Sequence, residues 1–142
     1  MYRHILIPTD GSELAERGSA HGLALAKSVG AKVSVIFVVE PFSEMSGRFL
    51  EVAARYAELR KEQAMSALVR AANAAKEAGV SCETIQVENG QPHQAIITTA
   101  QDRGCDLIVM SSHGRSGLSA LLIGSVTNKV VTHARTPVLV CQ

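Results

Sequence analysis

Unbroken runs of branched apolar residues, separated by stretches of helical character, constrain the fold of this chain more than any other feature. Unbroken runs are typical of strands covered on both faces. One further segment alternates apolar and polar side chains, as in a strand near a sheet edge with one wetter face. The pattern predicts five strands, at residues 5–7, 33–39, 82–87, 107–110 and 138–140.

Amphipathic segments fill the intervals between the expected strands. Gly30, Gly79 and Gly104 follow three of them, and a helix commonly ends at such a residue because glycine tolerates positive φ. In the longest segment, apolar residues such as Met65 recur about every 3.6 residues, so we expect them to face the core. Charged residues between them, such as Arg60, are expected to face solvent. The predicted helices span residues 14–29, 48–78, 92–103 and 125–134.

The alternation of strands and helices predicts the class of fold. Strands joined by helices form a parallel sheet with right-handed crossovers and helices on both faces, which is a three-layer α/β sandwich. We expect residues 1–142 to form a single domain of this kind. In such sheets ligands bind outside the carboxyl ends of strands, where successive connections leave toward opposite faces. The residues after 5–7, 33–39 and 107–110 are therefore the first candidates for a site.

Composition limits the classes of partner. Hydrophobic residues make up 46% of the chain, yet no apolar run approaches the roughly 20 residues that cross a bilayer. The net charge is +1, without basic runs, and aromatic residues make up 4%, so neither a groove for nucleic acid nor a stacking platform is expected. We therefore expect a cytoplasmic protein that binds neither membranes nor nucleic acids.

The cysteines and histidines form no pattern that predicts a metal site. Cys82, Cys105 and Cys141 lie far apart without the spacing of a zinc site, so we expect buried small residues there. Four histidines show no ligand spacing either, and surface or interface positions account for them: His4, His21, His93 and His133.

The segment after the fourth strand, residues 111–127, is rich in glycine and serine. Small residues let backbone N–H groups approach a ligand, and the segment leads into a predicted helix, whose first amides and dipole favour an anion. Ser125 and Thr127 add hydroxyl donors. Because Gly/Ser-rich connectors are also common between a strand and a helix, the residues alone leave two interpretations open, an anion site and a plain connector.

This segment resembles the nucleotide motif of the universal stress protein family. ATP-binding members carry a glycine, two residues, a second glycine, nine residues, and then Gly-Ser or Gly-Thr. Gly114 and the pair Gly124–Ser125 match the second and third parts, whereas Ser111 replaces the first glycine. Residues 7–12 and 136–140 resemble the family's opening and closing segments. The resemblance implies an adenine nucleotide alpha hydrolase-like fold with strand order 3-2-1-4-5.

Carried over by position, the resemblance implies a binding site for ATP. Val38 would offer backbone hydrogen bonds to adenine, and Met110 would pack on the base. Pro8, Thr9 and Asp10 would lie at the ribose and adenine, and Asp10 is a candidate to hold Mg²⁺ through water, because hard cations prefer oxygen ligands. The phosphates would lie among Ser111, Ser112, His113, Gly114, Arg115, Gly117, Gly124, Ser125, Val126 and Thr127.

The residues support a catalytic role less well than a binding role. Asp10 as a phospho-acceptor, as in response-regulator receivers, needs a lysine near the last strand, and 138–140 offers none. His113 beside two serines could indicate a serine nucleophile with a histidine base. Such a base must be oriented by a third group, and sequence neighbours seldom supply that geometry. No GxxxxGK[ST] motif occurs. We expect hydrolysis of ATP to be slow at most.

Two classes of function remain. In the first, the protein is an ATP-binding regulatory module of the stress-response type, in which the bound nucleotide changes loop order and partner choice. In the second, it is an interaction module that has lost nucleotide binding, and a slow ATPase is a third, weaker alternative. Gly114 and Gly124–Ser125 favour the first class, whereas Ser111 favours the second.

The last predicted strand indicates how the protein assembles. If this strand is outermost, its apolar side chains and unpaired backbone groups need a cover. A twofold homodimer that pairs these strands provides one, and the family resemblance points the same way. The expected interface residues are Pro137, Val138, Leu139 and Val140.

Overall fold

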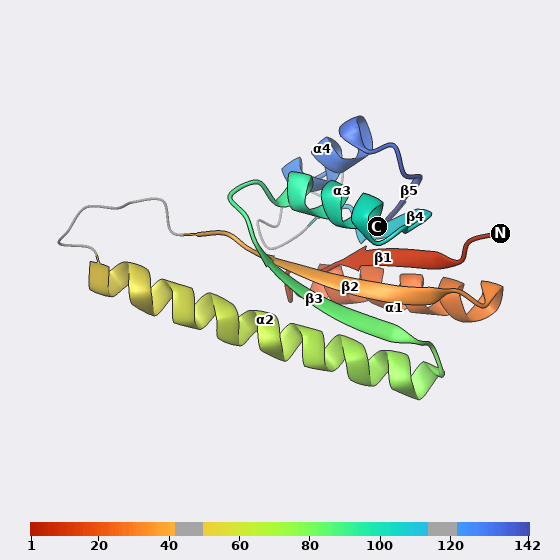
Figure 1. The fold of residues 1–142 in the computed structure, drawn as a ribbon, viewed down its shortest axis with the longest axis horizontal. Helices are drawn as coiled ribbons and strands as arrows, with labels where there is room; N and C mark the ends of the chain where they lie inside the picture. The colour runs from red at the N-terminus through yellow and green to blue at the C-terminus, as the bar shows by residue number, and fades with distance from the viewer. Residues whose placement is uncertain (42–49, 114–121) are drawn as a thin grey trace.

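The computed structural model describes residues 1–41, 50–113 and 122–142. In these residues a five-stranded parallel sheet has the order β3-β2-β1-β4-β5, with α1 and α2 on one face and α3 and α4 on the other (Figure 1). The strands are β1 (His4–Pro8), β2 (Lys32–Val39), β3 (Cys82–Glu88), β4 (Leu107–Ser111) and β5 (Val138–Cys141), and the helices are α1 (Glu13–Val29), α2 (Leu50–Ala78), α3 (Pro92–Asp102) and α4 (Ser125–His133). The predicted fold class and strand order are confirmed, and the predicted elements differ from these only at their ends.

Both faces of the sheet are buried, which explains the unbroken apolar runs. On the central strand β1, Ile5 and Ile7 pack with α1 and α2, while Leu6 packs with α3 and α4, and all three are fully buried. β1 and β4 are neighbours in the sheet, but the helices that follow them, α1 and α4, cover opposite faces. The carboxyl ends of β1 and β4 therefore form the point where a ligand site is expected.

Close packing of α1 on the sheet depends on two positions without a side chain. A Cβ at Gly22 would lie 2.5 Å from Cδ1 of Ile7, and a Cβ at Gly18 would lie 3.0 Å from the backbone nitrogen of Ser111. The first distance is shorter than packed side chains show, and the second would require the backbone of β4 to shift by a few tenths of an ångström. Glycine at these positions thus lets α1 lie directly on β1 and β4.

The expected orientation of α2 is wrong. Met65, expected in the core, is 66% exposed, whereas Arg60, expected in solvent, is 5% exposed. The buried face of α2 consists largely of alanines, such as Ala64 and Ala67, because small side chains let the helix approach the sheet. The guanidinium of Arg60 lies over the ring of Phe37, 5.2 Å from its centroid, which explains how a charged side chain is accommodated there.

The expected surface position of His4 is also wrong. Its ring is buried, with Nε2 2.7 Å from the Ser34 hydroxyl and Nδ1 3.1 Å from the Arg103 carbonyl oxygen. Burial, together with the nearby Lys32 ammonium, lowers the pKa of His4. His4 therefore belongs to the core at the amino-terminal edge of the sheet, away from the carboxyl ends of the strands.

The prediction for the cysteines holds only for one of them. Cys105 is buried in the turn before β4, and this burial raises the pKa of its thiol to about 11. Cys82 and Cys141 are half-buried, since they lie at the ends of the two edge strands.

Among the helices that the structure describes, none is both long and apolar enough to span a bilayer.

Candidate functional site

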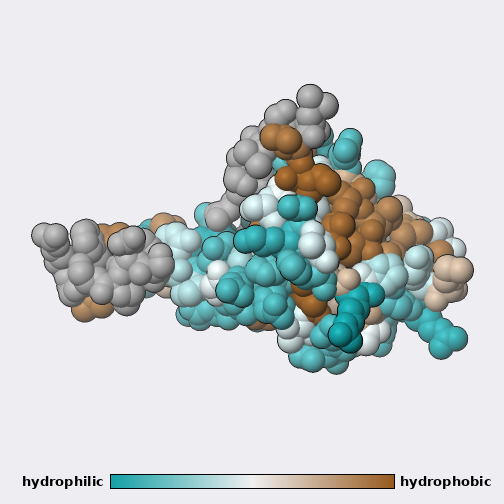
Figure 2. Space-filling model, turned by 90° about the horizontal axis from the view of Figure 1, so that it is seen from above, coloured by the Kyte–Doolittle hydropathy of each residue, from teal (hydrophilic) through white to brown (hydrophobic). Residues whose placement is uncertain are grey.

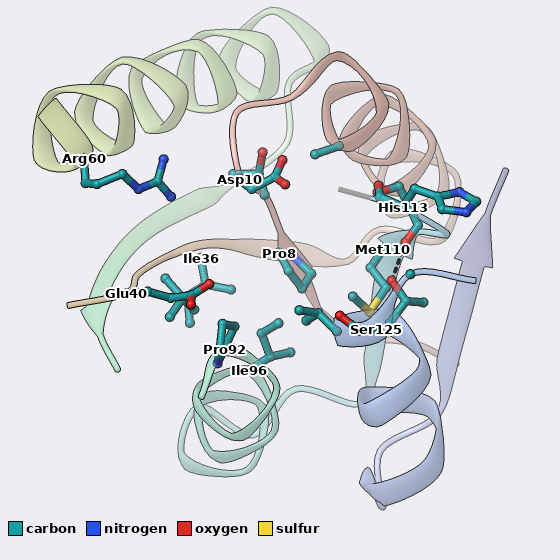
Figure 3. A pocket seen from close by; sticks show the side chains of 17 residues that line it. Pro8, Asp10, Ile36, Glu40, Arg60, Pro92, Ile96, Met110, His113 and Ser125 are labelled. Atoms are coloured by element: carbon teal, nitrogen blue, oxygen red, sulfur yellow. Dashed lines mark hydrogen bonds between the residues drawn. The ribbon is translucent and has the colours of Figure 1, made fainter. Parts of the chain in front are cut away.

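A cavity of about 290 Å³ lies at the carboxyl ends of β1, β2 and β4 (Figure 3). This is the edge of the sheet at which the sequence predicts a ligand site. Eleven of its lining residues are ones that the family resemblance places at the nucleotide: Pro8, Thr9, Asp10, Val38, Met110, Ser111, His113, Gly124, Ser125, Val126 and Thr127. Ser112 is buried beside the cavity and is not among its lining residues. Gly114, Arg115 and Gly117 lie outside the described residues.

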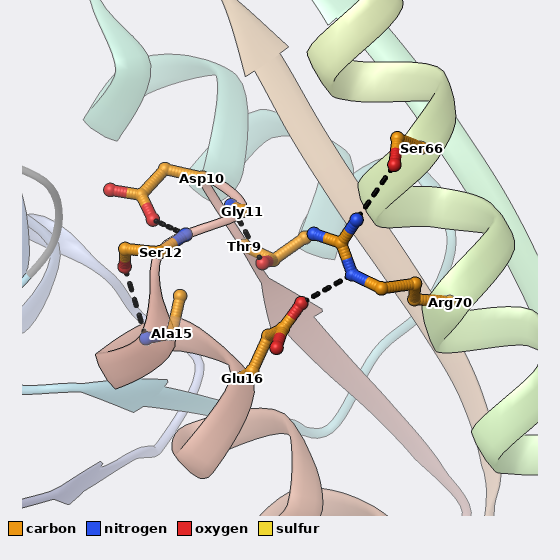
Figure 4. A network of polar contacts seen from close by, with 8 residues as sticks. All are labelled: Thr9, Asp10, Gly11, Ser12, Ala15, Glu16, Ser66 and Arg70. Carbon is orange, nitrogen blue, oxygen red and sulfur yellow. Dashed lines mark hydrogen bonds and ion pairs between the residues drawn. The ribbon is translucent and has the colours of Figure 1, made fainter.

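The turn between β1 and α1 holds Asp10 in a fixed position (Figure 4). Oδ1 of Asp10 accepts a hydrogen bond from the Ser12 backbone N–H at 2.9 Å, and the Thr9 hydroxyl accepts one from the Gly11 N–H at 3.2 Å. The Ser12 hydroxyl in turn caps α1 by accepting from the Ala15 N–H at 3.2 Å. The Asp10 carboxylate thus lies at the cavity wall on a backbone with little freedom.

An ion pair joins this turn region to α2. Arg70 on α2 donates from Nε to the Glu16 carboxylate on α1 at 2.6 Å and from Nη1 to the Ser66 hydroxyl at 2.7 Å (Figure 4). Both partners of the ion pair are about half exposed, so solvent screens it and its contribution to stability is small. Its geometric role is to align the start of α1 with the middle of α2.

The start of α4 forms the opposite wall of the cavity. Gly124 is the N-cap residue and has no side chain with which to cap the first turn. The first amides of a helix have no partner within it, so they suit an acceptor from outside the helix. The Gly124 N–H donates to the Ser112 carbonyl at 2.6 Å, and the Thr127 hydroxyl donates to the Ser111 carbonyl at 2.9 Å. These bonds tie the start of α4 to the end of β4.

Ser111 fits the position at which the family motif has a glycine. It is the last residue of β4, and no described residue other than glycine has a positive φ. Its hydroxyl donates to the His113 carbonyl at 2.6 Å, so the side chain bonds within its own loop. A serine is therefore accommodated there without backbone strain.

Within the part of the chain that the structure describes, Ser112 and His113 pair without the third member of a catalytic triad. The Ser112 hydroxyl lies 3.1 Å from Nδ1 of His113, and both residues are buried. Nε2 of His113 has no hydrogen-bond partner among the described residues, so no third group orients the ring as a base. The contact instead joins the side chains of the two described residues that directly follow β4.

The sequence did not indicate six of the lining residues. Ile36, Pro92 and Ile96 add apolar wall from β2 and α3, while Glu40 and Arg60 add charge, and Ala15 comes from the start of α1. Glu40 directly follows β2, so the rule about carboxyl ends of strands could have found it. Nothing in the sequence could have indicated Arg60, because the pattern of α2 placed this residue on the wrong face.

Comparison with known proteins agrees with the fold. The profile of the universal stress protein family matches residues 1–142. Universal stress protein MJ0531 of Methanocaldococcus jannaschii is 37% identical over 100% of this chain and 83% of its own length. Universal stress protein UspA from Lactobacillus plantarum superposes with a TM-score of 0.89 at 23% identity, covering 99% of this chain and 98% of its own.

A third relative was solved with a ligand. The universal stress protein from Archaeoglobus fulgidus in complex with dAMP has a TM-score of 0.69 and 21% identity, covering 99% of this chain and 98% of its own. At this identity the likeness concerns the fold, which is the sheet and helix arrangement described above. With the profile match over the full length and the relative from M. jannaschii, the conclusion is that this chain belongs to the universal stress protein family.

Proposed function

We propose that this protein binds ATP at the cavity and acts as a nucleotide-dependent regulatory module. The observation that carries the proposal is that one cavity combines an apolar slot, a fixed carboxylate and the start of a helix. Each of these suits a different part of a nucleotide. The complex of the A. fulgidus relative with dAMP supports the choice of an adenine nucleotide.

The apolar slot suits the base. Ile36, Val38 and Ile96 line it together with Met110, whose flexible thioether side chain packs well on flat rings. Val38, near the end of β2, also lines the cavity, and we propose that its backbone hydrogen-bonds to the edge of the base. The base would therefore lie between the end of β2 and the α3 side of the cavity.

The opposite side of the cavity suits the phosphates. The amides at the start of α4 and the Ser125 hydroxyl are proposed as donors, and the helix dipole adds partial positive charge. Asp10 lies between this end and α2 and is proposed to contact the ribose. Its carboxylate also suits Mg²⁺, because Mg²⁺ commonly uses one or two carboxylates together with water and substrate phosphates. The proposal assigns no catalytic residue.

The alternative, an interaction module without nucleotide, depended on Ser111. Since the structure accommodates this serine on an extended strand, the sequence argument for lost binding weakens.

Titration calorimetry with Mg·ATP distinguishes an ATP-binding module from an interaction module without nucleotide. We expect saturable binding in the micromolar range that is lost in Gly114→Val, because the family resemblance places Gly114 in the phosphate motif. Flat traces for the unchanged protein would leave the interaction module as the function.

We also propose that the protein forms a homodimer through β5. This strand is outermost in the sheet, and Leu139 is 42% exposed. Figure 2 shows apolar side chains gathered over one side of the layer that contains α3 and α4. Three further large apolar residues in or just before α4 are exposed: Leu122, Ile123 and Val131. The proposed interface centres on Pro137, Val138, Leu139 and Val140.

A charge at Leu139 tests this interface. We expect Leu139→Asp to sediment as a monomer or to aggregate, because two carboxylates would face each other across the twofold axis. Thr132→Asp, on the exposed side of α4, is the matched control and should sediment like the unchanged protein. A dimer that persists in Leu139→Asp would exclude β5 as the interface.

A further inference from the structure

Two histidines that are distant in the sequence meet where α3 and α4 pack together on one face of the sheet (Figure 1). His93 is the second residue of α3, and His133 is the last residue of α4. The centroids of their imidazole rings lie 6.3 Å apart, and the ring planes are tilted by 41°. No spacing in the sequence marks this pair, so it becomes visible only in the folded chain.

Both rings are accessible to a ligand. His133 is exposed and His93 is partly exposed, so solvent reaches both side chains. Among the described residues, neither ring takes part in a hydrogen bond or an ion pair. A neutral imidazole has one ring nitrogen with a free lone pair, and histidine is the commonest metal ligand in proteins. The pair therefore presents two neighbouring nitrogen ligands to solvent.

The separation of the two rings suits one shared metal ion. Bonds between imidazole nitrogen and Zn²⁺ measure about 2.0–2.1 Å, so two rings that share an ion at a tetrahedral angle have centroids roughly 5 Å apart. The separation of the His93 and His133 rings is slightly longer. Small rotations of the two side chains close the difference, and exposed side chains change rotamer readily. The two helices thus hold both ligands within reach of one ion.

The ligand set selects the class of metal. In the described part of the chain, no third histidine, cysteine or carboxylate joins this pair to make a larger cluster. Imidazole suits Zn²⁺, Ni²⁺ and Cu²⁺, whereas Mg²⁺ and Ca²⁺ prefer oxygen ligands. We propose that His93 and His133 together bind one divalent transition-metal ion of the class that includes Zn²⁺, with water at the remaining coordination positions.

Such an ion would join the two helices of this face. One ligand comes from the start of α3 and the other from the end of α4, so the bound ion links the two elements directly. A ligand that binds only the folded protein stabilises it, so the metal should raise the temperature of unfolding. The proposal does not depend on the nucleotide site, because neither histidine lines the cavity.

Calorimetric titration of the tag-free protein with ZnCl₂, in the absence of nucleotide, tests the proposal. We expect one saturable site per chain. His93→Gln and His133→Gln each remove one ligand and should weaken Zn²⁺ by at least about tenfold, because changes in the outer shell of a metal site alone cost about 10–100-fold. Zn²⁺ should raise the unfolding temperature of the unchanged protein and have little effect on that of either variant.

Two matched controls locate the metal. His21→Gln changes an exposed histidine on α1 and should leave the affinity for Zn²⁺ unchanged. Asp10→Asn changes the candidate Mg²⁺ ligand of the cavity and should also leave it unchanged. MgCl₂ in place of ZnCl₂ should give the same weak or absent heat in the unchanged protein and in both histidine variants.

A third variant is expected to act in the opposite direction. Lys129 lies one turn before His133 on α4, and burial together with the Lys129 ammonium lowers the pKa of His93, so this positive charge reaches the pair. Removing it in Lys129→Gln should strengthen Zn²⁺ binding, because a cation near the site repels the metal. A role of the two histidines in packing alone predicts no such gain.

The outcomes decide the proposal without reference to ATP. Absence of saturable Zn²⁺ binding would overturn it, as would an affinity that both His93→Gln and His133→Gln leave unchanged. Thermal unfolding without metal shows that each variant is folded, and the two exposed positions serve as independent tests. Since these titrations contain no nucleotide, either negative result leaves the proposed function in place.

Discussion

Replacing Ser125 with aspartate is expected to abolish ATP binding without unfolding the protein. Ser125 is the first residue of α4, its side chain is exposed, and it lines the cavity on the side where we propose that the phosphates bind. A carboxylate there would occupy the helix amides and repel the phosphates. At about 4 Å and an effective dielectric of about 20, two unit charges repel by about 4 kcal/mol, so affinity should fall by at least about a hundredfold.

The same substitution should leave stability unchanged or slightly higher. A negative charge in the first turn of a helix is favourable by about 0.3–1 kcal/mol. Calorimetry with Mg·ATP and thermal unfolding measure the two effects separately. Asn128→Asp is the matched control, since it adds the same charge on α4 at an exposed position that does not line the cavity. Undiminished ATP affinity in Ser125→Asp would show that the phosphates bind elsewhere.

Gly22→Val should destabilise the protein by about 1–3 kcal/mol or more, which is the usual cost of overpacking a core. A Cβ at Gly22 would lie 2.5 Å from Cδ1 and 3.0 Å from Cγ1 of Ile7, and Ile7 is fully buried on the central strand. A valine at this position would also approach Val109, because Cγ1 of Val109 lies 3.4 Å from the same Cβ position. Ala24→Val adds bulk at an exposed position on α1 and should cost only a few tenths of a kcal/mol.

Urea unfolding of these two variants measures the difference directly. We expect a lower midpoint for Gly22→Val with a similar slope, because the fold remains the same while its packing is strained. If Gly22→Val and Ala24→Val unfold at the same urea concentration, α1 does not pack on β1 as closely as the structure shows.

The strands of the sheet could be predicted from the sequence because each one is marked by its own short run of apolar residues. Runs such as Val33 to Val39 are apolar on both faces, which happens only where helices cover both sides. The orientation of α2 could not be predicted in this way. Its buried face is rich in alanine, so the larger apolar side chains, such as Met65, gave a misleading stripe. Which face of a helix is buried depends on the shape of the sheet beneath it as well as on hydrophobicity.

The candidate site was predictable where it follows strands and unpredictable where it depends on packing between layers. Asp10 and Ser111 lie at the carboxyl ends of β1 and β4, and a simple rule about parallel sheets places them at a site. Pro92 and Ile96 line the cavity only because α3 covers the same face as α4, which depends on the complete topology. Arg60 reaches the cavity from α2 through its contact with Phe37, a contact that no periodic pattern encodes.

The central claim is that the first turn of α4 binds the phosphates of a nucleotide through its backbone amides. Titration of ¹⁵N-labelled protein with Mg·ATP, followed by amide NMR, tests it most directly. The account predicts that the amides of Gly124, Ser125 and Val126 shift together, with a single dissociation constant that matches calorimetry. Saturating ATP that leaves these three amides unshifted would contradict it.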